Sequence, residues 1–117
     1  MPFEKTLTVI VRKPGKKLKK LYAVVKPHGF EWLGFYFDGK YLYTVGSSSE
    51  QKVSLPSKPG SHTFTVRNDD PLYAGEVEYI RIYAEYDGET RLIASRGYTE
   101  LGPGETVDIP FYVPGEI

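Results

Sequence analysis

The sequence predicts an all-β fold: a two-sheet antiparallel β-sandwich of seven to nine strands, immunoglobulin-like in broad architecture. Three observations predict it. Gly and Pro recur at short intervals along the 117 residues, and turn signals about eight to twelve residues apart are typical of sandwiches and barrels. Between the turns, apolar and polar residues alternate with the two-residue period of a strand, and no segment of about ten residues has helical spacing. One-sided alternation favours two antiparallel sheets around a shared core.

The stretch that organises this prediction is residues 76–98, EVEYIRIYAEYDGETRLIASRGY. Two runs rich in β-branched and aromatic residues flank Asp87-Gly88. Such a pair predicts a β-hairpin with a type I′ turn, which needs positive φ at both central residues. We expect this hairpin to lie at the centre of the fold, with Ile80, Ile82 and Ala84 on its buried side.

The other strands follow from the same alternation, taken in order. They are expected at Phe3–Lys13, Leu18–Lys26, Phe30–Phe37, Lys40–Val45, a short strand at Val53 and Leu55, Ser61–Arg67 and Glu105–Val113. Pro110 removes a backbone donor, so the last strand is expected to lie at a sheet edge or to be bulged. The predicted core comprises Leu7, Val9, Phe64, Val66, Ile80, Ile82, Val107 and Ile109. Leu21, Ala23 and Val25 share one face of their strand, and Phe111 and Val113 are in phase with Val107 and Ile109.

Length and composition set bounds on the class of protein. A chain of 117 residues is expected to form one domain, 1–117. The absence of cysteine excludes disulfides, thiolate metal sites and a cysteine nucleophile. No signal-peptide pattern occurs and no apolar run approaches the length of a membrane span, so we expect either a cytoplasmic protein or a mature or excised part of an exported one. Abundant Lys and Glu with few oxidisable residues suggest a thermostable protein.

The net charge is zero, but the charges are unevenly distributed. Residues 1–40 hold nine of the 15 basic and three of the 15 acidic residues, which leaves six basic and twelve acidic residues for 41–117. We expect a basic hairpin tip formed by Lys16, Lys17, Lys19 and Lys20. We expect the acids Glu76, Glu78, Glu85, Asp87 and Glu89 to lie on a separate surface. Separated opposite charges favour head-to-tail self-association, which a high salt concentration weakens.

Candidates for catalysis and metal binding are few. His28 and His62 are the two histidines and fall in different turns; a triad needs His near a nucleophile and a carboxylate, and no nucleophile motif is present. Asn68, Asp69 and Asp70, with Glu76 and Glu78, offer oxygens for Ca²⁺, but Asn and Asp before Pro71 are more simply turn initiators. We therefore expect no enzyme activity, no metal and no cofactor.

The interaction candidates are aromatic or basic. Tyr79, Arg81 and Tyr83 alternate with the core residues of the central hairpin and should form an outer stripe, a composition typical of protein interfaces and also suited, with Trp32, to stacking on sugars. The basic residues Lys16, Lys17, Lys19 and Lys20 suit an acidic protein surface. Nucleic acid is disfavoured as a partner because the acidic remainder of the chain repels a polyanion.

Residues 35–66, FYFDGKYLYTVG followed by VSLPSKPGSHTFTV, resemble PEGA-type and related immunoglobulin-like or transthyretin-like accessory modules. The matching residues are Asp38, Gly39, Lys40, Leu55, Pro56, Pro59, Gly60, His62 and Thr63. Residues 101–113 are similar to the closing strand of such modules. The resemblance implies a non-catalytic accessory module and supplies no site residues.

Two functions follow as expectations. The first is a non-enzymatic protein-interaction or structural module, such as an accessory, surface-layer or virion-type assembly domain, that binds itself or a larger assembly. The second is a carbohydrate-binding module that uses exposed Tyr and Trp side chains.

Overall fold

A computed structural model describes residues 15–117, which form nine β-strands and no helix. The strands are β1 (Leu18–Pro27), β2 (Glu31–Phe37), β3 (Lys40–Ser47), β4 (Gln51–Leu55), β5 (Gly60–Asn68), β6 (Gly75–Tyr86), β7 (Glu89–Arg96), β8 (Thr99–Leu101) and β9 (Thr106–Val113). The all-β prediction is confirmed. In this part of the chain there is also no helix with the length and apolar character needed to cross a membrane.

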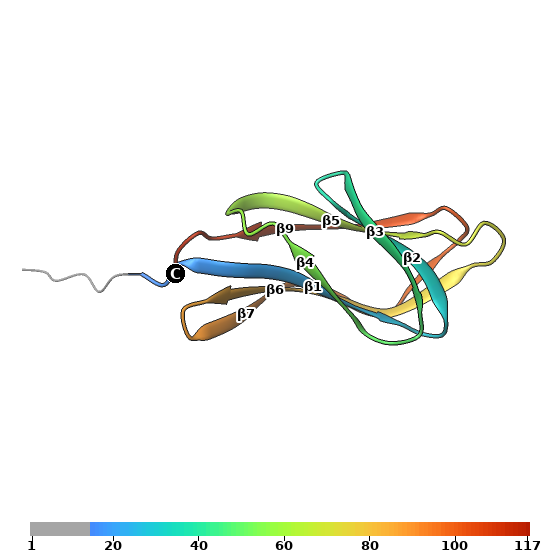
Figure 1. The fold of residues 1–117 in the computed structure, drawn as a ribbon, viewed down its shortest axis with the longest axis horizontal. Coiled ribbons are helices and arrows are strands. Elements are labelled where there is room, and N and C mark those ends of the chain that lie inside the picture. Colours follow the sequence, from blue (N-terminus) through green and yellow to red (C-terminus); the bar gives the residue numbers. More distant parts are fainter. Residues whose placement is uncertain (1–14) are drawn as a thin grey trace, which may run out of the picture.

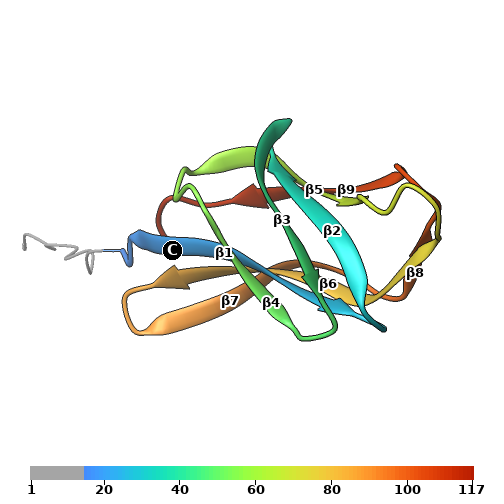
Figure 2. The same ribbon diagram turned by 45° about the vertical axis from the view of Figure 1, so that its right-hand side comes forward.

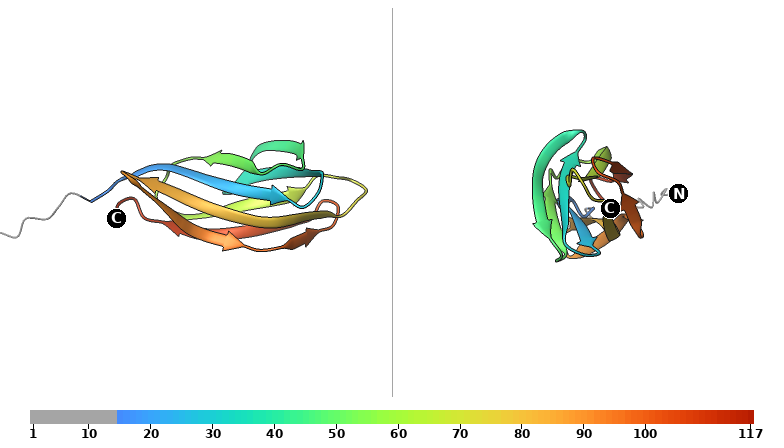
Figure 3. Two further views of the ribbon diagram at one scale, coloured as in Figure 1. Left: turned by 90° about the horizontal axis from the view of Figure 1, so that it is seen from below. Right: turned by 90° about the vertical axis from the view of Figure 1, so that its right-hand side faces the viewer.

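The strands form two antiparallel sheets. One has five strands in the order β4-β1-β6-β7, with β8 also paired to β6, and the other has the order β3-β2-β5-β9. Figure 1 shows β5 and β9 above β1, β6 and β7, and Figure 2 shows β2 and β3 side by side in the four-stranded sheet. The end view in Figure 3 shows the two sheets facing each other, and their buried apolar residues form one core cluster. The arrangement is the predicted β-sandwich.

The core is built by the pleat of each strand. Along β9, exposed and buried residues alternate without interruption, with Val107, Ile109, Phe111 and Val113 inside. Ile80 and Ile82 of the other sheet belong to the same core cluster and are fully buried. The six predicted core residues from Phe64 to Ile109 are buried as expected, as are Leu21, Ala23 and Val25 on their common face; Leu7 and Val9 lie outside the described residues. The alternation phase read from the sequence is therefore confirmed.

The central hairpin is confirmed, but its turn type is not. β6 lies between β1 on one side and β7 and β8 on the other. Gly88 has φ +69°, whereas Asp87 has no positive φ, so the turn is not type I′. That turn instead joins β2 and β3, where Asp38 and Gly39 have φ +49° and +78°. The Asp38 carboxylate accepts hydrogen bonds from the Thr63 N–H and from His62 on β5, and these hold the conformation in place.

The edge prediction for the last strand is correct, since β9 ends the four-stranded sheet. The predicted strand Phe3–Lys13 lies outside the described residues. Between Leu21 and Val25 both edges of β1 are occupied, by β4 and β6, so β1 has no free edge there for the expected hairpin partner. Backbone hydrogen bonds instead join Lys16 to Ile117, which places the C-terminal residues beside the start of β1 (Figure 1).

The predicted separation of charges is wrong. β1 and β6 are antiparallel neighbours, so the start of β1 lies beside the end of β6 and Lys20 stands directly opposite Glu85. The acids of the hairpin end, Glu85, Asp87 and Glu89, therefore share one end of the sandwich with the basic residues 16–20. Glu76 and Glu78 lie at the other end of β6. The charges on which head-to-tail association was expected thus lie partly side by side within one molecule.

Candidate functional site

The predicted stripe of Tyr79, Arg81 and Tyr83 lies on the outer face of the five-stranded sheet. Ile80, Ile82 and Ala84 on the same strand are fully buried, so their neighbours in sequence point outward. Arg81 is exposed and the two tyrosines are half-buried. This placement agrees with the sequence prediction.

Side chains from neighbouring strands complete the stripe. Tyr22 of β1 stands opposite Tyr83, and their rings stack with centroids 5.4 Å apart and an angle of 23° between planes. The ammonium of Lys52, on β4, lies 4.2 Å from the Tyr22 ring centroid. Leu92 of β7 pairs with Tyr83 from the other side and is 54% exposed. A Lys–Tyr–Tyr–Leu series of neighbouring side chains thus crosses β4, β1, β6 and β7.

A second contact lies farther along β6. The guanidinium of Arg81 lies 3.9 Å from the centroid of the Tyr79 ring, a cation–π geometry. The Tyr79 hydroxyl donates a hydrogen bond to the Glu50 carboxylate. We call the set Tyr22, Lys52, Tyr79, Arg81, Tyr83 and Leu92 the Tyr–Arg face. Its rings are held by neighbours and remain accessible, so little side-chain entropy is left to lose on binding.

The protonation of this face is set by its surroundings. Burial, together with the nearby Glu85 carboxylate, raises the pKa of Tyr22. The hydrogen bond to Glu50 raises the pKa of Tyr79. Both phenols are therefore neutral hydrogen-bond donors at any physiological pH, and the formal charge of the Tyr–Arg face comes from Lys52 and Arg81.

Sequence reasoning missed Tyr22, Lys52 and Leu92. The alternation of Leu21, Ala23 and Val25 already placed Tyr22 on the outer side of β1. The sequence did not predict that β1 pairs with β6 and β4 with β1, because the residues of a strand do not determine which strands lie beside it.

The predicted basic residues are dispersed. Lys20 lines a cavity of about 300 Å³ with Tyr22, Lys52, Ser54 and Ser57, so it adjoins the Tyr–Arg face. Lys16 and Lys17 instead lie where the chain pairs with its C-terminal residues. Lys19 is exposed. Of the four lysines, Lys20 is the one that the fold brings to the face.

Trp32 is also separated from the predicted tyrosines. It lies on β2 in the four-stranded sheet, and the alternating residues Leu33, Phe35 and Phe37 are in the core. Its side chain therefore projects from the opposite outer surface of the sandwich. A single platform made of Tyr79, Tyr83 and Trp32 does not form.

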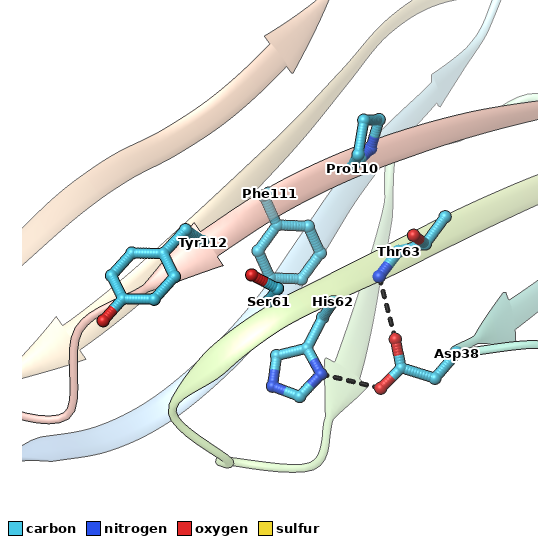
Figure 4. A pocket seen from close by; sticks show the side chains of 7 residues that line it. All are labelled: Asp38, Ser61, His62, Thr63, Pro110, Phe111 and Tyr112. Atoms are coloured by element: carbon cyan, nitrogen blue, oxygen red, sulfur yellow. Dashed lines mark hydrogen bonds and ion pairs between the residues drawn. The ribbon is translucent and has the colours of Figure 1, made fainter.

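A cavity of about 450 Å³ lies beside His62 (Figure 4). The imidazole Nδ1 is 2.6 Å from the Asp38 carboxylate and Nε2 is 2.7 Å from the carbonyl oxygen of Lys58. Ser61 points to the other side of the β5 ribbon (Figure 4). Both imidazole nitrogens are engaged away from this hydroxyl, so the nucleophile–base hydrogen bond that acyl transfer needs is missing.

The Asp38 carboxylate is held by hydrogen bonds from two residues of β5. Burial alone would raise the pKa of Asp38, but hydrogen bonds from the Thr63 N–H and His62 bring it below its usual value. The Thr63 N–H donates to Asp38 Oδ1 over 2.8 Å. These contacts tie the β2–β3 turn to β5, a structural role.

The other polar candidates also have structural roles. Asn68, the one buried polar residue in 15–117, donates to the carbonyls of Tyr73 and Leu101 and accepts from the Asp70 N–H. Asp70 accepts from the backbone of the following turn. His28 is exposed and lies 3.2 Å from Glu78. In the described range no three His, Asp or Glu side chains are grouped to hold a metal ion.

Comparison with known proteins adds no assignment: the chain matches no protein-family model, no curated protein and no solved structure. The resemblance of residues 35–66 to PEGA-type and transthyretin-like modules therefore stays a prediction.

Proposed function

We propose that the protein is a non-enzymatic interaction module that binds a second copy of its own chain through the Tyr–Arg face. The observation that carries this proposal is the contact series Lys52–Tyr22–Tyr83–Leu92, with Arg81 packed on Tyr79 beside it. Rigid, accessible tyrosines around an arginine are the side chains that most often dominate binding energy at protein interfaces.

The charges around the Tyr–Arg face favour a second copy as the partner. Lys20 and Lys52 lie on the β4–β1 half of this surface, whereas on β6 the two carboxylates of Glu78 and Glu85 outnumber the one guanidinium of Arg81. In a two-fold, face-to-face dimer the basic half of one copy covers the acidic half of the other. This geometry replaces the head-to-tail contact expected from the sequence.

The proposal includes a wider class. An immunoglobulin-like accessory, surface-layer or virion-type assembly domain is supported by the resemblance of residues 35–66, and a thermostable chain by its composition. A module without catalytic activity is supported by the engagement of both His62 nitrogens.

Sedimentation velocity and light scattering over a concentration series test the proposal. At low salt we expect a concentration-dependent dimer, which weakens at 1 M salt as the screening length falls from about 10 Å at 0.1 M to about 3 Å. Arg81→Ala and Tyr83→Ser should each abolish the dimer. Tyr112→Ser is the matched control, since Tyr112 is 63% exposed on the other sheet. A wild-type chain that stays monomeric at about 1 mM in low salt, a concentration at which even an interface of about −4 kcal/mol is half occupied, would refute it.

A further inference from the structure

The outer face of the four-stranded sheet carries its own line of aromatic and polar side chains. On β2, Trp32 and Tyr36 point outward because Leu33, Phe35 and Phe37 point into the core. They are four positions apart along the strand, about 13 Å at about 3.3 Å per residue. Gly34 lies between them and has no side chain, so the backbone of β2 is not covered by a side chain of its own at that point.

Trp32 lies flat on the sheet. A Cβ at Gly46, its partner on β3, would stand 2.6–2.8 Å from the six-membered part of the indole. The ring therefore covers the bare backbone of Gly46, and its other side is open, with 49% of the residue exposed. Phe30 packs against it edge-on, with centroids 5.6 Å apart. A flat, half-exposed indole is a stacking surface for C–H groups, because the ring face carries the negative end of its quadrupole.

Polar groups fill the space between the two aromatic residues. The Asp69 carboxylate lies over Gly34, where a Cβ would stand 2.4 Å from its Oδ2. The Thr44 hydroxyl donates to this Oδ2 over 2.7 Å. The hydroxyl has one proton, so the Tyr41 hydroxyl, 2.8 Å away, is the donor in its own contact with Thr44. The result is a directed chain of hydrogen bonds that ends on a carboxylate.

The far end of the line is a cavity of about 350 Å³, lined by Tyr36, Gly39, Thr65, Arg67, Gly104 and Thr106. This volume lies within the range of small-molecule sites. It presents one aromatic ring, one guanidinium and two threonine side chains. Arg67 Nε is 3.5 Å from Asp69, so the cavity joins the polar groups over Gly34. The Tyr36 hydroxyl and then the Asp69 carboxylate raise the pKa of Arg67.

The set Trp32, Tyr36, Tyr41, Thr44, Arg67 and Asp69 is named the β2 row. We propose that the β2 row binds a neutral oligosaccharide that runs along β2. One sugar ring stacks on Trp32, the next presents its hydroxyls to Asp69 and Arg67, and a third enters the cavity against Tyr36. This site lies on the sheet opposite the Tyr–Arg face, so it is independent of the proposed function.

Three features select this class of ligand. Aromatic rings separated by hydrogen-bonding groups match a sugar chain, whose rings have apolar C–H faces and hydroxyl edges. Arg67 and Asp69 neutralise each other, which favours an uncharged ligand over an acidic or basic one. Neighbouring hydroxyl groups of a sugar can donate hydrogen bonds to the Asp69 carboxylate and accept them from the Arg67 guanidinium.

The test uses the intrinsic fluorescence of the full chain, because Trp32 is its one tryptophan. Cello-, manno-, xylo- and malto-hexaose are titrated separately, with acrylamide quenching measured at each point. We expect one of these neutral glycans to shift the emission and protect Trp32 from quencher, saturably and below about 10 mM, ten times the Kd that corresponds to about −4 kcal/mol.

Variants separate the parts of the β2 row. Tyr36→Ala and Arg67→Met keep the fluorophore and should weaken binding by about threefold to tenfold each. Gly46→Ala should lift the indole from the sheet, which changes emission without ligand and weakens binding by a similar factor. Trp32→Ala, followed by calorimetry, should lose measurable binding. Tyr112→Ala is the control, an exposed tyrosine on the same sheet outside the row; circular dichroism checks that each variant is folded.

Three results would overturn the assignment. The first is the absence of any saturable change with all four hexaoses. The second is binding that Tyr36→Ala and Arg67→Met leave unchanged. The third is tighter binding of a polygalacturonate fragment than of every neutral glycan, which would assign an acidic ligand instead. Failure of these tests leaves dimerisation through the Tyr–Arg face unaffected, because that face lies on the other sheet.

Discussion

Replacement of Asp38 tests how the β2–β3 turn is held. Asp38 has φ +49°, and its carboxylate accepts hydrogen bonds from the Thr63 N–H and from His62. Hydrogen bonds that involve a charged group contribute about 1.5–3 kcal/mol each. The Asp38 side chain is 42% exposed, so solvent weakens the ionic part, and we take about 2 kcal/mol for the two bonds together.

Three substitutions separate the causes. Asp38→Asn keeps the tolerance for positive φ and an acceptor for Thr63, so it should lose about 1 kcal/mol. Asp38→Gly keeps the backbone conformation and loses both bonds, about 2 kcal/mol. Asp38→Ala adds the left-handed strain of about 1 kcal/mol, which gives about 3 kcal/mol.

Urea unfolding followed by circular dichroism measures these differences as shifts in midpoint at constant slope. If Asp38→Ala lowers the free energy of unfolding no more than Asp38→Gly does, position 38 has no positive φ. If Asp38→Asn lowers the free energy of unfolding as much as Asp38→Gly does, the acceptor that Asn retains for the Thr63 N–H contributes nothing to stability. Either result refutes the account of this turn.

The same carboxylate predicts a pH dependence. The pKa of Asp38 is lower in the folded protein than in the unfolded chain, so its contribution is complete above the unfolded pKa, about 3.9. It is lost as the pH falls from there through the lower folded value. The difference in unfolding free energy between wild type and Asp38→Asn should therefore shrink below about pH 4. A difference that stays constant from neutral pH to pH 2 would argue against an ionised Asp38 as the cause.

The remaining predictions concern the central hairpin and one tyrosine. Ile82→Ala empties a fully buried position and should lower the free energy of unfolding by about 2–5 kcal/mol; a loss below about 1 kcal/mol in urea unfolding would place Ile82 at the surface. Gly88 has φ +69°, so Gly88→Val should cost about 1–2 kcal/mol, and an unchanged melting curve would contradict this. The hydrogen bond to Glu76 raises the pKa of Tyr98 to about 12; ultraviolet titration should show one tyrosine whose late ionisation moves to lower pH in Glu76→Gln, and a titration identical in the two proteins would remove that hydrogen bond.

The alternation of apolar and polar residues was enough to predict which side of each strand is buried. In β9 the four inward residues follow from alternation alone, and Pro110 correctly predicted an edge strand. β8 was missed because it is three residues long and pairs with the first residues of β6. So short a segment carries no periodic signal.

The candidate sites were harder to predict because they depend on pairing between strands. Tyr79, Arg81 and Tyr83 were found from one strand. Tyr22 became part of the site through its register opposite Tyr83. Asp69 reaches Thr44 across a gap left by Gly34, a contact between positions 25 residues apart. Register and sheet order are tertiary properties, and no local pattern of residues encodes them.

The expectation of separated charges failed for the same reason. Charge blocks along the chain translate into charged surfaces only when the blocks occupy different places in the fold. β1 belongs to the basic part of the chain and the end of β6 to the acidic part, but the two strands lie side by side, so that Lys20 stands opposite Glu85.

The edges of the two sheets have a consequence for how this protein behaves when concentrated. An exposed edge strand offers unpaired backbone groups to any other chain and is the usual starting point of fibrils. Here β9 contains Pro110, β4 has five residues and ends before Pro56, and β7 carries Arg91 and Arg96 beside a bulge. Each device hinders the addition of a further strand. β3, the other edge of the four-stranded sheet, is bulged between Tyr41 and Tyr43, and a bulge also hinders the addition of a strand. Contacts between molecules are thus directed to side chains on the sheet faces, where association leaves the native strands in place.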